Sequence, residues 1–274
     1  MATTQTALAA LPQTQSAPKR STRFDLGLIA GIAIALAATI AGICSTGVSF
    51  TYFLQPTGVV IVLGGTLGVL LVTTPRHAIL HSLRRVIELV TVPEMNRANM
   101  IEEIVYYARA ARRGGILSLE PMIAKTTNDD LRKALQLAVD VSNRVELQTV
   151  LDTELRMAER QGETDAKTLE VAGGFAPTIG IIGTVIGLID VLRQFSNVQS
   201  VGYGIGTAFV STIYGLALAN LLLLPLAHRI RAHVAEKFER QELIMEGVLA
   251  IVDSVHPTLI QMRLKCFLRA ANES

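Results

Sequence analysis

The sequence predicts an all-α fold: an integral membrane protein with four transmembrane helices and a helical cytoplasmic domain. The first observation is the distribution of charge, because the fifty residues between Asp25 and Arg76 and the thirty-four between Arg193 and His228 carry no charged side chain. The second is the composition, with 50% hydrophobic and only 18% charged residues. Buried helices of a soluble protein are the alternative, but soluble domains do not segregate charge in this way.

Four segments are long and apolar enough to cross a bilayer core of about 30 Å, which requires roughly 20 helical residues. They are residues 26–44, 56–75, 171–189 and 205–227. Short links join the first two and the last two, so each pair is expected to form a hairpin. Pro177 and Pro225 lie in the third and fourth spans, and each lacks a backbone donor. We therefore expect each proline to kink or end its span, either as a static bend or as a hinge.

Lysine and arginine side chains gather on one side of the predicted spans. They precede the first span and follow the second and fourth, whereas the two links contain only Arg193. This distribution predicts that both termini and the long middle segment are cytoplasmic. The expected divisions are a disordered tail that is not a cleaved signal at 1–24, a transmembrane hairpin at 25–75, a cytoplasmic helical domain at 76–168, spans three and four at 169–228, and a cytoplasmic helical segment at 229–274.

The middle segment is predicted to be helical and solvated. Its 14 basic and 14 acidic residues balance, which disfavours a surface for nucleic acid or anionic lipid. Apolar residues recur every three or four positions up to a helix stop at Gly114 and Gly115. Asn128 or Asp129 is expected to cap the next helix, and a third helix is expected to run on toward the third span. After the fourth span, a further amphipathic helix is expected to reach about His256.

The predicted spans contain hydroxyl groups but no Asp, Glu, Lys, Arg or His at membrane depth. The third span carries Thr178 and Thr184, and the fourth carries Ser211 and Thr212. Hydroxyl oxygens can coordinate a cation or hold water without the cost of burying a charge. Alternatively, they bond to their own helix or join neighbouring helices. An ion pathway through these spans would need its titrating carboxylate from a partner protein.

Several other classes of protein are disfavoured. A net charge of +2 and the absence of Trp argue against a nucleic-acid partner. The sequence has no phosphate-binding loop, dinucleotide motif, zinc-protease motif or serine-hydrolase motif, so neither an enzyme nor a cofactor is expected. Cys44 and Cys266 predict no disulfide, and His77 and His81 share a helical face without further ligands, so no metal site is expected.

Three stretches resemble a known family. Residues 175–192 (FAPTIGIIGTVIGLIDVL) and 204–225 (GIGTAFVSTIYGLALANLLLLP) resemble the paired third and fourth spans of the MotA/TolQ/ExbB ion-channel proteins. The segment GGTLGVLLVTTP at 64–75 resembles the end of the second span in the flagellar-motor branch, the MotA or PomA type. The hairpin before the cytoplasmic part is also similar to that branch, because TolQ and ExbB relatives have a single span there.

The resemblance implies a stator subunit of the bacterial flagellar motor, in the cytoplasmic (inner) membrane and in contact with its lipid. It implies a homopentamer around a dimer of a MotB/PomB-type partner, which has one span, binds peptidoglycan and supplies the ion-binding aspartate. It also implies proton, or alternatively sodium, as the transported ion, and the rotor protein FliG as the target of the cytoplasmic loop.

The resemblance also implies roles for individual residues. By position, Pro177 and Pro225 match motor-coupling prolines, Thr184 and Thr212 match hydroxyls near the partner's aspartate, and Arg112 and Glu120 match the charged pair that meets the rotor. Two departures concern the ion pathway: Thr178 stands where the family often has a small apolar residue, and Ser211 opens STIYG where TTLYG is commoner. The alternatives are a TolQ/ExbB-like energising subunit of another envelope machine and a membrane scaffold without transport.

Overall fold

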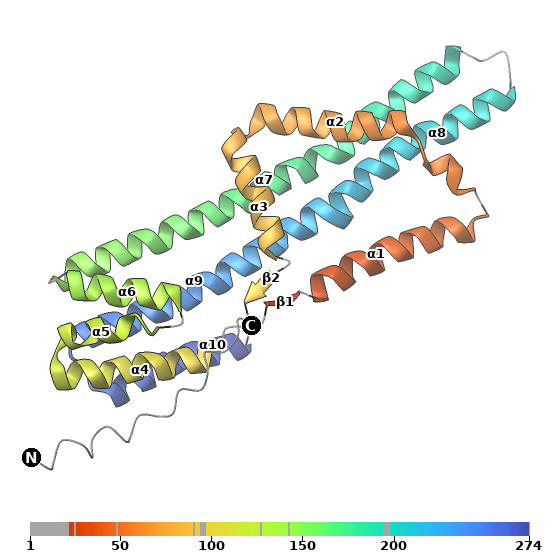
Figure 1. Cartoon of the computed structure of the whole chain (residues 1–274). Helices are drawn as coiled ribbons and strands as arrows, with labels where there is room; N and C mark the ends of the chain where they lie inside the picture. Colours follow the sequence, from red (N-terminus) through yellow and green to blue (C-terminus); the bar gives the residue numbers. More distant parts are fainter. Residues whose placement is uncertain are drawn as a thin grey trace, which may run out of the picture. The chain divides into compact units, whose positions relative to one another are not determined.

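The structure is a computed structural model of the chain, drawn in Figure 1. It describes residues 22–24, 26–47, 49–89, 91–93, 97–126, 128–141, 143–193 and 198–273. Except for its last three residues, the predicted tail at 1–24 lies outside this part. The chain divides into two compact units, which we call the apolar unit and the polar unit. The apolar unit comprises Phe24–Thr91 and Arg156–Phe238, and the polar unit comprises mainly Val92–Leu155 and Glu239–Ser274.

The apolar unit contains the charge-free stretches of the chain together with the charged helix Arg76–Leu89 and charged parts of two longer helices. The order of its elements along the chain is α1 (Leu26–Ser45), a 3-10 turn (Phe50–Phe53), α2 (Pro56–Thr73), α3 (Arg76–Leu89), the second part of α7 (Arg144–Arg193), α8 (Val198–Ala217), a π-helical turn (Leu218–Leu223) and the first part of α9 (Leu224–Val252). In Figure 1, α7 and α8 run side by side, and α2 lies across them.

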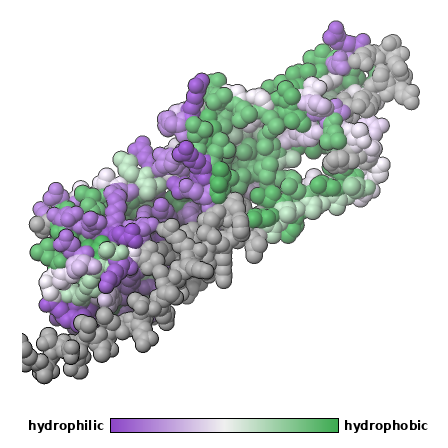
Figure 2. Space-filling model, viewed as in Figure 1, coloured by the Kyte–Doolittle hydropathy of each residue, from purple (hydrophilic) through white to green (hydrophobic). Residues whose placement is uncertain are grey.

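Among the described residues, three helical stretches are long and apolar enough to cross a membrane: Thr51–Thr73, Arg144–Arg193 and Gly204–Val252. The apolar helix at Ile29–Ser45 is shorter than these three. Figure 2 shows hydrophobic residues gathered over the apolar helices. The predicted class, an α-helical membrane protein, is confirmed, and the count of four spans stays a prediction.

Neither proline in the predicted spans ends its helix. Pro177 lies inside the fifty-residue helix α7, and Pro225 is the second residue of α9. The π-helical turn comes directly before Pro225, and there the N–H of Leu224 bonds to the C=O of Ala219, five residues back. A wider turn relieves the clash that a proline ring makes with the carbonyl four residues earlier in an α-helix. Of the two expected effects, an end of the helix is therefore not observed at either proline, and a kink stays a prediction.

The polar unit is a bundle of shorter amphipathic helices. It contains α4 (Arg97–Gly114), a 3-10 turn (Ile116–Leu119), α5 (Glu120–Ile123), α6 (Asp129–Asp140), the first part of α7, the last part of α9, and α10 (Pro257–Glu273). Helix α4 packs against α10. The core gathers fully buried apolar residues from five helices, including Ile104, Leu135, Leu147, Leu243 and Leu264. Burial raises the pKa of the Tyr107 hydroxyl, which is hydrogen-bonded to Thr126 over 2.6 Å.

Most of the predicted helix ends in this unit are confirmed. Helix α4 stops at Gly114, and Gly115 has a φ of 78°, a left-handed conformation that favours glycine. Asn128 caps α6, because its side-chain oxygen accepts hydrogen bonds from the N–H groups of Asp130 and Leu131. Helix α9 ends earlier than predicted, at Val252 rather than near His256, because Ser254 takes a positive φ of 56°.

Two short strands were not expected from the sequence. β1 (Thr22–Phe24) and β2 (Thr91–Pro93) pair in a two-stranded sheet. Three-residue strands are too short to show the alternation of apolar and polar residues by which strands are recognised. The rest of the secondary structure in the described part is helical, so the predicted class is unaffected.

Replacing Asn128 by alanine should remove the cap of α6 at a cost of about 1 kcal/mol. The expected result is about fivefold faster hydrogen exchange of the amides in Asp129–Asp140, measured on the full-length protein. Asn128→Asp keeps the accepting oxygen and should exchange as the unchanged protein does. Equal exchange in all three proteins would contradict the capping role.

Candidate functional site

Glycine lets α7 and α8 approach until their backbones touch. A Cβ atom added to Gly215 would lie 2.5 Å from the backbone oxygen of Ala176, and one added to Gly180 would lie 2.9 Å from that of Ser211. Nearer the linked ends of the two helices, a Cβ on Gly187 would lie 2.7 Å from the Cβ of Ala208. Small residues at such contacts are typical of packed transmembrane helices. Polar groups on one helix can therefore reach the backbone of the other.

The hydroxyl of Thr184 makes such a contact between the two helices. It lies 3.1 Å from the carbonyl oxygen of Ala208 on α8 and 3.2 Å from that of Gly180 on its own helix, and it is also hydrogen-bonded to the hydroxyl of Thr212. A carbonyl only accepts, so the Thr184 proton points to one of the two carbonyls and Thr212 can donate to Thr184. The two threonines form a buried polar pair, and Thr184 is only 9% exposed.

The other two hydroxyls of the predicted ion pathway differ from this pair. Ser211 is buried, and it faces glycines of two helices: a Cβ on Gly58 of α2 or on Gly183 of α7 would lie 2.8 Å from an atom of its side chain. Thr178 is exposed and donates to the carbonyl of Phe175 on its own helix, over 2.7 Å. The structure thus brings Thr184 and Thr212 together and leaves Thr178 bonded to its own helix.

Helix α2 covers the α7–α8 pair, and Tyr214 fixes the start of this helix. The hydroxyl of Tyr214 donates to the carbonyl of Phe53 and accepts from the N–H of Gln55, over 3.1 Å, in the link between α1 and α2. Further along, a Cβ on Gly65 would lie 2.6 Å from the side chain of Ile179. No local sequence pattern indicates this role of Tyr214, because its two hydrogen bonds join residues 159 and 161 positions apart.

The two prolines that are expected to couple ion flow to motion lie toward the end of the contact region that is farther from the α7–α8 link. Pro177 is partly buried on α7, three residues before Gly180. Because proline has no N–H, the carbonyl of Gly173 loses its usual partner within the helix. Pro225 is also partly buried and follows Leu224, against which Gly173 packs. The backbone hydrogen-bond ladder is therefore interrupted on both helices at this end of the contact.

The expected rotor-contact residues, Arg112 and Glu120, lie in the polar unit. Both are exposed, and the structure gives neither an ion pair within the described part of the chain. Arg112 lies in the last turn of α4, and Glu120 is the first residue of α5. Ser118 does not cap α5, because its hydroxyl donates back to the carbonyl of Gly115. Both charged side chains are therefore available to another protein.

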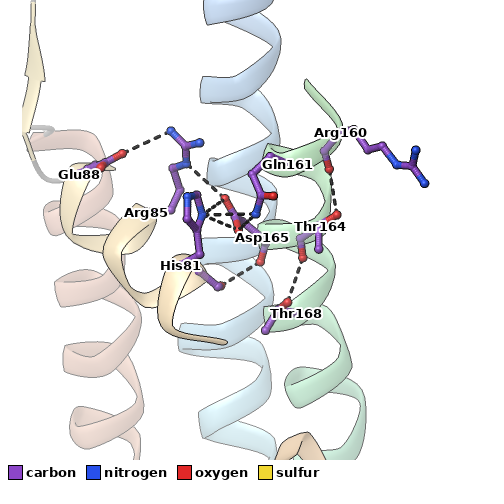
Figure 3. Close-up of polar contacts among 9 residues, drawn as sticks. His81, Arg85, Glu88, Arg160, Gln161, Thr164, Asp165 and Thr168 are labelled. Atoms are coloured by element: carbon purple, nitrogen blue, oxygen red, sulfur yellow. Dashed lines mark hydrogen bonds and ion pairs between the residues drawn. The ribbon is translucent and has the colours of Figure 1, made fainter. Parts of the chain in front are cut away.

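His81 contacts an aspartate of another helix. The Nδ1 atom of His81 lies 2.9 Å from both carboxylate oxygens of Asp165, which is fully buried. No group of three or more potential metal ligands occurs among the described residues. His81 therefore belongs to a polar contact between α3 and α7, which Figure 3 shows.

Comparison with known proteins identifies the family. Residues 123–243 match the MotA/TolQ/ExbB proton channel family, and residues 29–114 match the N-terminal family of motility protein A. The two matches follow one another without overlap and cover both the hairpin and the α7–α8 pair. The chain belongs to the MotA/TolQ/ExbB proton channel family. The resemblance stated from residues 64–75, 175–192 and 204–225 is confirmed.

Individual members of this family assign the chain to its motility branch. It is 29% identical over 252 residues to motility protein A of Bacillus subtilis, covering 90% of this chain and 92% of the relative. It is 28% identical over 243 residues to the chemotaxis protein PomA of Vibrio alginolyticus, covering 89% and 93%. The solved MotAB stator complex of Bacillus subtilis has a chain of 28% identity that superposes with a TM-score of 0.83, over 89% of this chain and 96% of that one. The protein is thus a flagellar stator subunit of the MotA/TolQ/ExbB family.

The close α7–α8 contact predicts that alanine substitutions at two glycines of α8 affect the unfolding temperature differently. Gly215→Ala places a methyl group against the backbone of Ala176 and should lower the unfolding temperature of the detergent-solubilised protein by several degrees. Gly206→Ala is the matched control, since no atom lies within 4 Å of its added Cβ. Alanine is the better helix former by about 1 kcal/mol, so the control should be unchanged or slightly stabilised. Equal unfolding temperatures for the two variants would argue against the backbone contact.

Proposed function

We propose that this protein couples the flow of protons across the bacterial inner membrane to torque on the flagellar rotor, together with a MotB/PomB-type partner. One observation carries the proposal: the tightly packed α7–α8 pair presents the hydroxyls of Thr184 and Thr212 to one another in a stretch that contains no Asp, Glu, Lys, Arg or His. The chain resembles the MotAB stator over nearly its whole length, which supports this assignment.

The missing carboxylate argues for a partner. Proton relays through membranes are built on ionisable side chains held inside the bundle. Residues 171–189 and 205–227 contain no Asp, Glu, Lys, Arg or His, so a carboxylate that binds and releases the ion must come from another chain. A partner with one span and a membrane-embedded aspartate, anchored to peptidoglycan, would supply it. The protein itself is neither an enzyme nor dependent on a cofactor in this proposal.

The surface of α7 supports an assembly of several subunits. A row of large apolar side chains on this helix is exposed in the single chain: Ile181, Ile182, Val185, Ile186 and Ile189. Such a row requires lipid, a partner helix or further copies of the chain to cover it. We propose a homopentamer around a partner dimer, in which this row is divided among these neighbours. Both termini and the polar unit lie in the cytoplasm in this arrangement, as the basic residues beside the spans predict.

The site itself is compatible with either ion. Threonine hydroxyls can hold a water chain for protons or take part in the shell of a sodium ion. Thr184 donates to a carbonyl and accepts from Thr212, so lone pairs of both hydroxyl oxygens remain for water or a cation. We propose proton as the ion because the matching family is a proton channel family, and we keep sodium as the outcome that the flux measurement below distinguishes.

The match to the N-terminal family of motility protein A favours the flagellar motor over a TolQ/ExbB-like machine. It covers residues 29–114, which include the hairpin and helix α4 that ends near Arg112. In this proposal, Arg112 and Glu120 act on the rotor protein FliG from the exposed edge of the polar unit.

The subunit alone should conduct poorly in liposomes, because its spans offer no group that exchanges the ion. Co-reconstitution with the MotB-type partner should raise proton flux at least tenfold, measured with an internal pH dye under an imposed potential. Sodium uptake, followed with a radioactive tracer, should not rise. Fast proton uptake by the subunit alone would refute the requirement for a partner, and sodium uptake in place of proton uptake would refute the choice of ion.

Charge reversal at the rotor edge should separate torque from assembly. Arg112→Glu and Glu120→Lys turn an attraction into a repulsion against a complementary face, so motility should fall, most strongly at low ionic strength. Membrane levels and proton flux should remain. Arg156→Glu and Glu102→Lys are matched reversals at other exposed positions and should leave swimming unchanged. Normal swimming of both Arg112→Glu and Glu120→Lys would count against this contact.

A further inference from the structure

Asp165 is a buried carboxylate on which several donors converge (Figure 3). Its side chain has no exposed area, and it accepts hydrogen bonds from the ring of His81 and from Gln161, over 2.9 Å and 3.1 Å. Arg85 lies 3.4 Å away and supplies a positive charge. The hydroxyl of Ser82 donates to the backbone oxygen of the same aspartate, over 2.9 Å. Three residues of α3 thus contact one residue of α7.

The arrangement selects a carboxylate. An ionised carboxylate only accepts, and each side-chain group that faces it is a donor, so the Nδ1 atom of His81 must carry the proton. An asparagine at this position would turn N–H groups toward the N–H groups of Gln161 or Arg85. Burying a charge is costly and apolar packing would serve stability as well, so an ion pair at this place points to a specific registration of α3 on α7.

Apolar packing places the same two helices together with α9. Leu89 of α3, Leu169 of α7 and Ile230 of α9 are buried in one small cluster. Arg231 of α9 is hydrogen-bonded to Glu170 and Glu163 of α7, and these bonds raise the pKa of its guanidinium group. Residues 161–170 of α7 are therefore held from two sides, by α3 and by α9.

The α2–α3 pair is attached to α7 at two points. One point is Asp165, contacted by α3, and the other is Ile179, against which Gly65 of α2 packs. Fourteen residues, or about 21 Å of helix, separate the two points along α7. Pro177, where the backbone ladder lacks one hydrogen bond, lies between them. Helix α2 ends at Thr73 and α3 begins at Arg76, so the chain can bend between these two helices.

We propose that Asp165 is a positioning residue, which locks α3 onto α7 so that the α2–α3 pair braces α7 on both sides of Pro177. Any bend of α7 at the proline must then be accompanied by a bend between Thr73 and Arg76. The brace limits the directions in which α7 can flex. The brace itself stands apart from the proposed function, whereas its role in torque rests on that function.

Hydrogen exchange on the full-length protein in lipid nanodiscs tests the brace. Asp165→Asn should raise amide exchange about tenfold in residues 76–89, which lose their lock, and also in residues 170–182, which contain Pro177 but do not contact Asp165. Glu159→Gln is the matched control: it removes an exposed carboxylate from the same helix and should change neither segment. Exchange in α6 reports on the polar unit and should stay constant.

Two outcomes would overturn the proposal. Unchanged exchange in residues 76–89 would mean that Asp165 does not hold α3. A rise there without a rise in residues 170–182 would mean that the lock is local and exerts no control over the proline. If Asp165→Asn raises exchange throughout the chain, His81→Ala decides by the same two criteria, because it removes one half-exposed donor and leaves Arg85 and Gln161 on the carboxylate.

Swimming tests the role of the brace in torque. Asp165→Asn should reduce swimming speed severalfold at an unchanged membrane level, and Glu159→Gln should not. Normal swimming with faster exchange in both segments would keep the brace and refute its role in torque. The exchange result does not depend on motility, so a failure of the proposed stator function and a failure of the brace can be told apart.

Discussion

The close contact between the backbones of α7 and α8 is the interaction on which the rest of the apolar unit depends. Gly180 and Gly215 allow the approach, and only at this distance can Thr184 reach the carbonyl of Ala208 and the hydroxyl of Thr212. The interior of a bilayer offers no water to polar groups, so an unpaired polar group there costs free energy. Hydroxyls that are hydrogen-bonded to one another and to a carbonyl avoid most of this cost. The same contact forms the surface on which α2 packs and Tyr214 holds the link before it.

Much of the fold could be predicted from the sequence because its signals are local. Charge-free stretches mark the apolar helices, Gly115 marks the end of α4 by its positive φ, and Asn128 marks the start of α6 by its side-chain oxygen. The end of α9 was predicted about four residues late, because Ser254 is not a residue type that marks a left-handed turn. The π-helical turn before Pro225 was also missed, since a wider turn has no distinct apolar period.

The candidate site could be predicted only in part, because only its local signals are visible in the sequence. The types and spacing of Thr184 and Thr212 are visible in the sequence, whereas their mutual hydrogen bond depends on the glycines that bring the helices together. Thr178 shares the residue type but faces outward, so composition alone could not separate it from the pair. The contact of His81 with Asp165 spans 84 residues, and no pattern within either helix indicates it.

The buried ion pair and the proline on α7 have complementary physical consequences. A helix that lacks one hydrogen bond bends more easily there, but an easy bend transmits force only when its direction is restrained. The residues before Pro177 are tied to α3 and α9 by charged contacts, and those after it are packed against α2 and α8 by glycine. Gly162 and Gly173, before the proline, also pack closely against α9. Neighbouring helices therefore hold α7 on both sides of Pro177, and these contacts restrain the direction in which the helix can bend there.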